Sequence, residues 1–344
     1  MSRPRGLCRT PIVRLVRNLI ERNYVLADKI LQGDVRATAR LIRLIDDGDR
    51  TALHDLRRLY PHAGRSHVIG FTGSPGVGKS TLVDRIVAKF RRDGKTVGIL
   101  AIDPTSPFSG GAILGDRVRM QNHFLDEGVF IRSLATRGAF GGLTRSTADS
   151  IVVLEAMGKD VVIIETVGVG QDEVDVANSA QTTVLATIPG MGDDIQAIKA
   201  GLMEIGDIFV VNKSDREGAA KTIRELSFMV AMGDERYRDE GWIPPIMPTT
   251  ALDDGGVEDL YKTILAHRTH LRAGDGKELV RRRRIRVRNQ LLDLLKDNLI
   301  AKSMDRIGGT EALGTIVDEI VAGKSDPYGA SLDLVEKILG GTSD

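Results

Sequence analysis

Residues Gly73-Ser74-Pro75-Gly76-Val77-Gly78-Lys79-Ser80, with Thr81 directly after them, form a loop sequence of the type G-x-x-x-x-G-K-S. The loop lies between a short apolar run at 67–72 and apolar residues at helical spacing from 82 to 87. A glycine-rich turn that binds nothing is the alternative, and the complete match between a predicted strand and helix disfavours it. Glycines let backbone N–H groups turn toward phosphate oxygens, and the helix dipole favours negative charge there. We therefore expect Lys79 to contact the β and γ phosphates of a nucleotide and Ser80 to ligate Mg²⁺.

Short apolar runs and helical stretches alternate through the middle of the chain. The runs lie at 67–72, 96–102, 129–134, 160–164, 182–188 and 208–211. This alternation is typical of βαβ units and predicts an α/β fold, a P-loop NTPase with a mostly parallel sheet flanked by helices. Helical periodicity alone precedes and follows it. The predicted parts are a helical N-terminal extension (1–64), the P-loop core (65–272) and a helical C-terminal arm (273–344).

Composition and charge exclude several classes of protein. The chain has 344 residues, 48 Lys and Arg against 47 Asp and Glu, and no apolar run near the roughly 20 residues of a membrane helix. Neither nucleic acid nor a membrane is therefore an expected partner. A single cysteine, Cys8, excludes an internal disulfide and fits a cytoplasmic protein, or one of the mitochondrial matrix in a eukaryote. The arginines before Glu21 suit a transit peptide, but we favour an arm leading into a helix from Thr10-Pro11.

Two acidic residues, Asp103 and Glu165, follow predicted strands. Ligands of an open parallel sheet bind outside the carboxyl ends of its strands, so both carboxylates should lie near Lys79 and Ser80. For either acid alone, we would accept the alternative that the carboxylate caps a neighbouring helix. Two beside a phosphate loop favour positioning of a metal or of water, because carboxylate oxygens are ligands for hard cations.

The run after Glu165 is Thr166-Val167-Gly168, and it is typical of a nucleotide switch. The N–H of Gly168 is expected to meet the γ-phosphate. Val169 follows, where Ras-type GTPases have a water-orienting glutamine, so we expect slow hydrolysis unless a partner or another loop completes the site. Gln171 is one candidate for that role. Arg137 is another candidate phosphate contact, with a loop salt bridge as its equal alternative.

The choice of base is predicted by Asn212-Lys213-Ser214-Asp215, an N-K-x-D element after an apolar run. The carboxylate of Asp215 can accept hydrogen bonds from N1–H and N2–H₂ of guanine, a donor pair that adenine lacks. This favours GTP and GDP over ATP. The segment Thr249-Thr250-Ala251 matches the position of a second base-contacting loop, in which Thr250 and Ala251 are candidate contacts. The alternative for the tetrapeptide is an Asn/Asp turn that opens a helix.

Taken together, these motifs closely resemble the GTPase chaperones of adenosylcobalamin-dependent methylmalonyl-CoA mutase. This is the MeaB/ArgK type, to which the human methylmalonic aciduria type A protein belongs. The resemblance runs from about residue 25 to 339, and its most specific parts are the loops at 103–117 and 165–171. The departures at Met191 and Asp193-Asp194-Ile195 are tolerable, and further departures at Ala180 to Thr187 and at Thr249-Thr250 leave the exact client mutase open.

The resemblance implies a homodimeric GTPase whose C-terminal arm dimerises. Such proteins bind the mutase, gate delivery of its cobalamin cofactor and protect it from inactivation; a cobalamin adenosyltransferase is a second implied partner. Position by position, the resemblance implies an acidic metal environment of Asp103, Asp116 and Glu165, with Ser80 as a ligand. It also implies that the loop 189–199 couples the nucleotide to the partner.

Three alternatives remain open at this stage. A P-loop kinase would phosphorylate a small molecule or a transport protein, and would accept ATP. A nickel-insertion GTPase would need metal ligands, whereas only His267 and His270 have ligand-like spacing and are predicted to be surface residues. A nucleic-acid or scaffold module would use the run Arg281–Arg284, which we predict to be a solvated face or to pair with charges across a dimer arm.

Overall fold

The structure is a computed structural model, which describes residues 26–104, 123, 125–136, 142–166, 172–190, 205–233, 237 and 241–340. Within these ranges the side chains at 103, 104, 136, 142–145, 172–175 and 339 are not described. The chain divides into two units, 1–286 and 287–344. The helix predicted to begin at Thr10-Pro11 lies outside the described residues. The three-part division at 64 and 272 stays a prediction.

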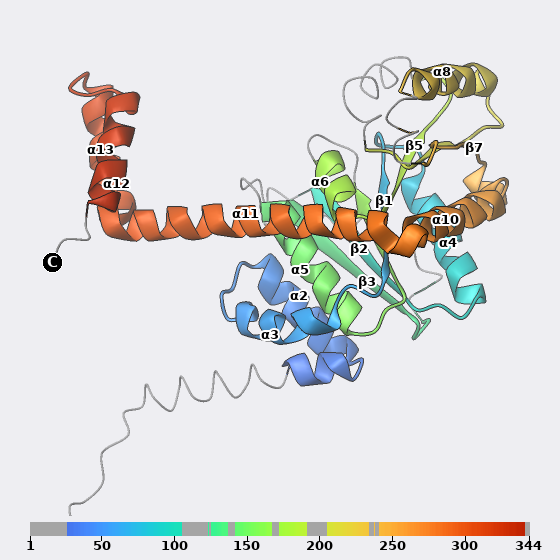
Figure 1. The fold of residues 1–344 in the computed structure, drawn as a ribbon, viewed down its shortest axis with the longest axis horizontal. Coiled ribbons are helices and arrows are strands. Elements are labelled where there is room, and N and C mark those ends of the chain that lie inside the picture. The colour runs from blue at the N-terminus through green and yellow to red at the C-terminus, as the bar shows by residue number, and fades with distance from the viewer. Residues whose placement is uncertain are drawn as a thin grey trace, which may run out of the picture. The chain divides into compact units, whose positions relative to one another are not determined.

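A seven-stranded sheet forms the centre of the first unit (Figure 1). Its order is β3-β2-β4-β1-β5-β6-β7, and each pair of neighbouring strands is parallel. The strands are β1 (His67–Thr72), β2 (Val97–Pro104), β3 (Val129–Thr136), β4 (Val161–Thr166), β5 (Thr182–Thr187), β6 (Ile208–Val211) and β7 (Ile246–Pro248). The predicted α/β fold with a parallel sheet is thereby confirmed.

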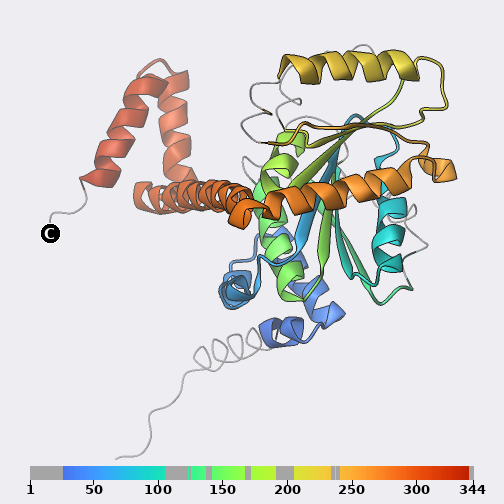
Figure 2. The ribbon, with the colours of Figure 1, turned by 45° about the vertical axis from the view of Figure 1, so that its right-hand side comes forward.

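Both faces of this sheet are covered by helices, because successive strand residues point to opposite sides. Val162 and Ile164 of β4 join the core cluster of one face, and Val161 and Ile163 join that of the other. The first face carries α2 (Val35–Asp46), α3 (Ala52–Leu59), η1 (Tyr60–His62), α5 (Gly142–Ala156) and α6 (Asp172–Ser179); the second carries α4 (Lys79–Arg92) and α10 (Val257–Arg272) (Figure 2). Helix α8 (Ala219–Met232) packs on β6 and β7.

The described part of the N-terminal extension is helical, as predicted. It comprises a helical turn at 26–31 followed by α2 and α3, which pack against α5. Asp34 caps α2 by accepting a hydrogen bond from the backbone N–H of Ala37 at 2.8 Å. The buried carboxylate of Asp55 accepts the N–H of Ala27 at 3.1 Å and so fixes the first turn to α3.

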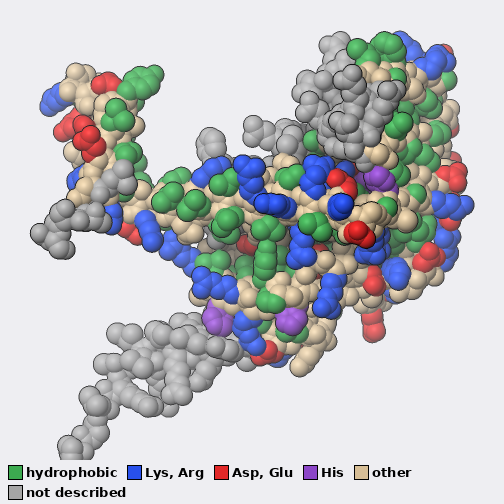
Figure 3. Space-filling view, viewed as in Figure 1, with side chains coloured by type: hydrophobic (Ala, Val, Ile, Leu, Met, Phe, Trp, Pro, Cys, Tyr) green, Lys and Arg blue, Asp and Glu red, His purple; other side chains and the backbone are tan. Residues whose placement is uncertain are grey.

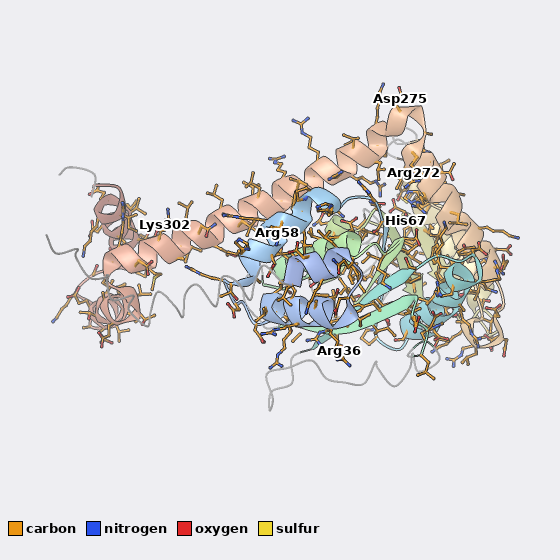
Figure 4. All side chains as sticks on the ribbon, turned by 90° about the horizontal axis from the view of Figure 1, so that it is seen from below. Arg36, Arg58, His67, Arg272, Asp275 and Lys302 are labelled. Carbon is orange, nitrogen blue, oxygen red and sulfur yellow. The ribbon has the colours of Figure 1, made fainter. Side chains whose placement is uncertain are left out.

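After α10 the chain turns through η5 (Gly274–Gly276) into the long helix α11 (Lys277–Ile307). Figure 4 shows Asp275 at this turn, where its backbone has a left-handed φ of 62°. Helix α11 begins in the first unit and continues into the second, which also holds α12 (Gly309–Val321) and α13 (Pro327–Leu339). The described helices include none that is both long and apolar enough to cross a bilayer.

Part of the arginine run packs against the core, so the prediction of a solvated face is wrong for Arg282. Its guanidinium donates to both carboxylate oxygens of Asp207, at 2.8 and 2.9 Å, and to the carbonyl of Gln181 at 3.0 Å. Burial would lower the pKa of Arg282, but the Asp207 charge raises it above its ordinary value. Arg282 therefore fixes the start of α11 to Asp207, the residue that directly precedes β6.

His267 is also buried, which contradicts the prediction that it is a surface residue. Its Nδ1 lies 2.9 Å from Thr182 Oγ1, which in turn lies 2.7 Å from Nε2 of His67. His67, labelled in Figure 4, is the first residue of β1. Its ring lies 4.7 Å from that of Trp242. Burial lowers the pKa of His267 to about 4, so the ring is neutral at pH 7. Three buried polar side chains in contact with one another thus connect β1, β5 and α10.

We expect Arg282→Ala to destabilise the protein more than the matched change Arg284→Ala on the exposed side of the same helix. Removing one partner of a largely buried ion pair leaves Asp207 without its counter-charge, at a cost of about 3 kcal/mol. For a unit of 286 residues, whose unfolding entropy is about 0.6 kcal/mol/K, that lowers the melting temperature by about 5 °C. Thermal unfolding followed by circular dichroism measures the shift. Equal melting temperatures for the two variants would contradict the importance of this ion pair.

Candidate nucleotide-binding site

The predicted phosphate loop connects β1 to α4 at the carboxyl edge of the sheet, where parallel sheets bind ligands. Gly73, Gly76 and Gly78 have positive φ angles of 129°, 77° and 95°. A Cβ on Gly73 would lie 2.0 Å from the carbonyl oxygen of Ala186 in β5. Glycine is therefore required where the loop leaves the sheet, both by the backbone angle and by this close approach.

Lys79 and Ser80 begin α4, and both are buried. The ammonium group of Lys79 donates to the carbonyls of Gly73 at 2.5 Å and Ser74 at 2.9 Å, so the side chain folds back over the loop. The Ser80 hydroxyl donates to Oε1 of Glu165 at 2.6 Å. The structure thus brings Glu165 to Ser80, two residues that were predicted from the sequence to lie close together.

The donor set around Ser80 fits Mg²⁺. Because the hydroxyl gives its hydrogen to Glu165, the lone pairs of its oxygen remain available to a cation. A hydroxyl and a carboxylate are the hard oxygen ligands that this ion prefers. Glu165 is buried at 3% exposure at the end of β4, so its charge is little screened by solvent.

Asp103 lies at the same edge as Glu165. Its strand β2 pairs with β4, and Ala101 is the register partner of Glu165, so Asp103 comes two residues further along the neighbouring strand. Only its backbone is described. The other predicted site residues of the switch loops, Asp116 and Gly168, lie outside the described residues, as do Arg137, Gln171 and 191–199.

The N-K-x-D element follows β6 and is bonded to the phosphate loop. Nδ2 of Asn212 donates to the carbonyl of Val77 at 2.8 Å, and Nζ of Lys213 donates to that of Gly76 at 2.8 Å. A Cβ on Gly78 would lie 2.4 Å from Nδ2 of Asn212, so the close contact needs glycine there. The N-K-x-D element, which is predicted to bind the base, therefore fixes the loop that is predicted to bind the phosphates.

Asn212 also fixes the second predicted base loop. Its Oδ1 accepts hydrogen bonds from Oγ1 of Thr249 and from the backbone N of Ala251, both at 3.1 Å. Asp215 is exposed three residues further on, and Thr250 is half-buried in the loop beside Ala251. Both predicted base elements thus lie at one edge of the sheet.

One contact at this site is absent from our sequence predictions. Arg85 of α4 donates to the carbonyls of Ala251 and Leu252 in the base loop, at 3.2 and 2.9 Å. An arginine within an amphipathic helix is by default a surface residue, and its partners lie more than 160 positions away. No local signal in the sequence distinguishes it.

The fold and this edge of the sheet define a class, the P-loop nucleotide-binding proteins with the base-reading element of a GTPase. The chain belongs to the family of methylmalonyl Co-A mutase-associated GTPases, MeaB, whose family model matches residues 38–307.

Individual relatives agree with this membership. A protein of Pyrococcus abyssi is 46% identical over 317 residues, which cover 92% of this chain and 97% of that protein. The mitochondrial methylmalonic aciduria type A homolog of Caenorhabditis elegans is 30% identical over 331 residues, 92% of this chain and 82% of that protein. The crystal structure of a LAO/AO transport system kinase has a TM-score of 0.65 at 24% identity, over 92% of this chain and 97% of that one, and so shares the fold.

Proposed function

We propose that this protein binds and hydrolyses GTP with Mg²⁺ and acts as a chaperone of an adenosylcobalamin-dependent mutase of the methylmalonyl-CoA type. In that role it gates delivery of the cobalamin cofactor and protects the mutase. The observation that carries the proposal is the link through Asn212 between the phosphate loop and both base elements. Family membership supports the choice of client, since the family is described by its association with that mutase.

The proposed site residues have different roles according to their position. Backbone N–H groups of the phosphate loop and Thr81 hold the phosphates, while Asn212, Lys213, Asp215, Thr250 and Ala251 hold the base. Ser80, Asp103, Asp116 and Glu165 are the proposed metal environment, and Mg²⁺ would neutralise charge on the phosphates. The proposed catalytic groups are Lys79, Asp103, Glu165 and the N–H of Gly168.

Lys79 has a direct role in the reaction we propose. Hydrolysis by in-line attack of water spreads negative charge over the transferring phosphoryl group. The ammonium group of Lys79 already lies over the loop, where it contacts two carbonyl oxygens. Exchanging those carbonyls for phosphate oxygens places a positive charge where the transition state gains negative charge, in a buried position where the attraction is strong.

The start of the proposed partner loop lies beside the base-reading element. A Cβ on Gly218, which precedes α8, would lie 3.8 Å from Cβ of Pro189 and 4.0 Å from the nitrogen of Gly190. Gly218 comes three residues after Asp215. This proximity supports a loop at 189–199 that responds to the bound nucleotide and presents that response to the partner.

The second unit supports a homodimer as the working form. Its helices expose large apolar side chains, and Figure 3 shows hydrophobic surface along α11. The exposed apolar residues of α11 in this unit include Leu291, Leu295, Leu299 and Ile300. Val317, Val321, Leu332 and Val335 of α12 and α13 are exposed as well. Apolar surface of this extent favours association. We propose a second copy of this chain as the partner, as the family resemblance implies.

The client is tested by mixing the purified protein with methylmalonyl-CoA mutase. We expect the two to form a complex whose dissociation constant differs at least about tenfold between GDP and a non-hydrolysable GTP analogue, a typical coupling between two sites. We further expect transfer of adenosylcobalamin to the mutase to depend on the bound nucleotide in the same way as complex formation does. The visible absorption of the cofactor measures this transfer. A cobalamin adenosyltransferase loaded with cofactor serves as the donor.

Two outcomes separate the parts of this proposal. Lack of association with the mutase in every nucleotide state would overturn the chaperone role and leave the GTPase activity standing. ATP used as readily as GTP, with phosphate transferred to a third molecule, would replace the GTPase by the kinase alternative.

A further inference from the structure

The base loop between β7 and α10 is a tight turn. It contains the 3₁₀ turn Ala251–Asp253, and its ends meet through two hydrogen bonds between Thr250 and Gly255, at 2.8 and 3.1 Å. Asp254 and Gly256 have left-handed φ angles of 59° and 70°, and a Cβ on Gly256 would lie 2.2 Å from the carbonyl oxygen of Pro248. Carbonyl groups at the end of so short a helical turn require donors from elsewhere.

Arg85 supplies those donors. Its Nε donates to the carbonyl of Ala251 at 3.2 Å, and its Nη2 donates to that of Leu252 at 2.9 Å. Asn212 accepts the N–H of Ala251 from the other side, at 3.1 Å. The peptide groups of Ala251 are therefore held at the N–H by the N-K-x-D element and at the carbonyl by the phosphate-loop helix.

The same helix binds both ends of the proposed nucleotide site. Lys79 and Ser80 lie in the first turn of α4, and Arg85 follows five residues after Ser80. Further along, Lys89 lies 2.5 Å from Asp254, which ends the 3₁₀ turn. The base loop is consequently attached to the rigid element that carries the phosphate contacts, and its distance from the phosphate loop is fixed.

We propose that Arg85 is a positioning residue for guanine recognition. By fixing the base loop at a set distance from the phosphate loop, it makes binding of the base and binding of the phosphates mutually dependent. The planar guanidinium group is suited to this role, because its rigid fork presents two donors in a fixed direction to two successive carbonyl groups, whereas a lysine ammonium is a point charge on a flexible stem. The inference rests on the proposed guanine-nucleotide site and identifies a residue that the site's motifs do not contain.

The test compares Arg85→Met, which keeps most of the aliphatic stem, with Arg85→Lys and with the control Arg92→Met. Arg92 lies on the same helix, is half exposed and bonds to Glu258 rather than to the base loop. Dissociation of fluorescently labelled GDP, and its competition by GDP, ADP and inorganic tripolyphosphate, are measured for each protein. Circular dichroism establishes that each variant is folded.

We expect Arg85→Met to weaken GDP binding about tenfold to thirtyfold, the range expected for losing hydrogen bonds from a charged donor. Binding of tripolyphosphate, which has no base, should stay within about twofold. The preference for GDP over ADP should shrink accordingly. Arg85→Lys should be intermediate, because it keeps the charge and N–H donors but loses the fixed geometry of the guanidinium fork, and Arg92→Met should match the wild-type protein.

The outcomes that overturn the role of Arg85 are distinct from those that overturn the site. Unchanged GDP binding in Arg85→Met, or equal losses for GDP and tripolyphosphate, would refute a base-positioning role. Should Arg85→Met fail to fold, an Arg85→Lys protein with wild-type GDP affinity and preference would refute it equally. Wild-type protein without any preference for GDP over ADP would instead overturn the guanine site itself.

Discussion

Lys79→Ala should lower the rate of GTP hydrolysis at saturating nucleotide by about 10²- to 10³-fold, the usual cost of removing one group that stabilises transition-state charge. The ammonium group is held over the phosphate loop by the carbonyls of Gly73 and Ser74, and the residue is only 6% exposed. Alanine leaves those carbonyl dipoles facing the phosphates with no positive charge between them. Release of inorganic phosphate in steady state measures the rate.

The fold should survive this change, because the loop carbonyls can hydrogen-bond to water once the ammonium group is gone. The matched control is Lys95→Ala, an exposed lysine just beyond the end of the same helix, whose loss should leave turnover unchanged. A Lys79→Ala protein that melts like the wild type and still turns over GTP at the wild-type rate would remove the phosphate loop from the reaction.

The parts of the site that were predictable are those encoded within a few residues of one another. A glycine loop with its lysine and serine depends on backbone geometry over eight positions, so the sequence alone predicts it. The parallel order of the strands then brings Glu165 to Ser80, although 85 positions separate them. A strand-end acid could be predicted because parallel strands of one sheet end at a common edge.

His267 shows where a usable signal was overlooked. Leu260, Ile264 and Leu271 are buried on one face of α10, and His267 lies between them at helical spacing. The apolar periodicity therefore placed His267 on the buried face, whereas a metal-ligand pattern with His270 drew attention to the polar character of both residues. Periodicity was the better guide, because burial of the whole face determines the fold of the helix.

Arg282 and Arg85 show what local patterns cannot supply. Asp207 is 75 positions from Arg282, and Ala251 is 166 positions from Arg85. Each arginine lies in a helix whose neighbouring positions carry other charges, so the sequence offers no means of choosing the one that packs on the core. Their partners are set by how helices pack on the finished sheet, which is a property of tertiary structure.

The second large expected effect is on the affinity for guanine nucleotides, and it comes from substituting Asp215. Asp215→Asn should weaken GDP binding by about 100-fold or more, because a site built to hydrogen-bond its substrate discriminates strongly once those bonds cannot form. An amide at this position can accept one hydrogen bond from guanine, but its NH₂ group then faces the guanine amino group, donor against donor. Isothermal titration with GDP measures the loss.

Xanthine nucleotides provide the decisive contrast, since xanthine has a carbonyl oxygen where guanine has its 2-amino group. The side-chain amide that this substitution introduces can donate to that oxygen, so Asp215→Asn should bind xanthosine diphosphate more tightly than GDP, while the wild-type carboxylate repels the oxygen. The matched control is Glu217→Gln, an exposed acid-to-amide change two residues away, which should keep the preference for GDP. If Asp215→Asn kept that preference too, Asp215 would not be the residue that reads the base. Asn212 would still connect the N-K-x-D element to the phosphate loop, but groups other than Asp215 would have to bind the base.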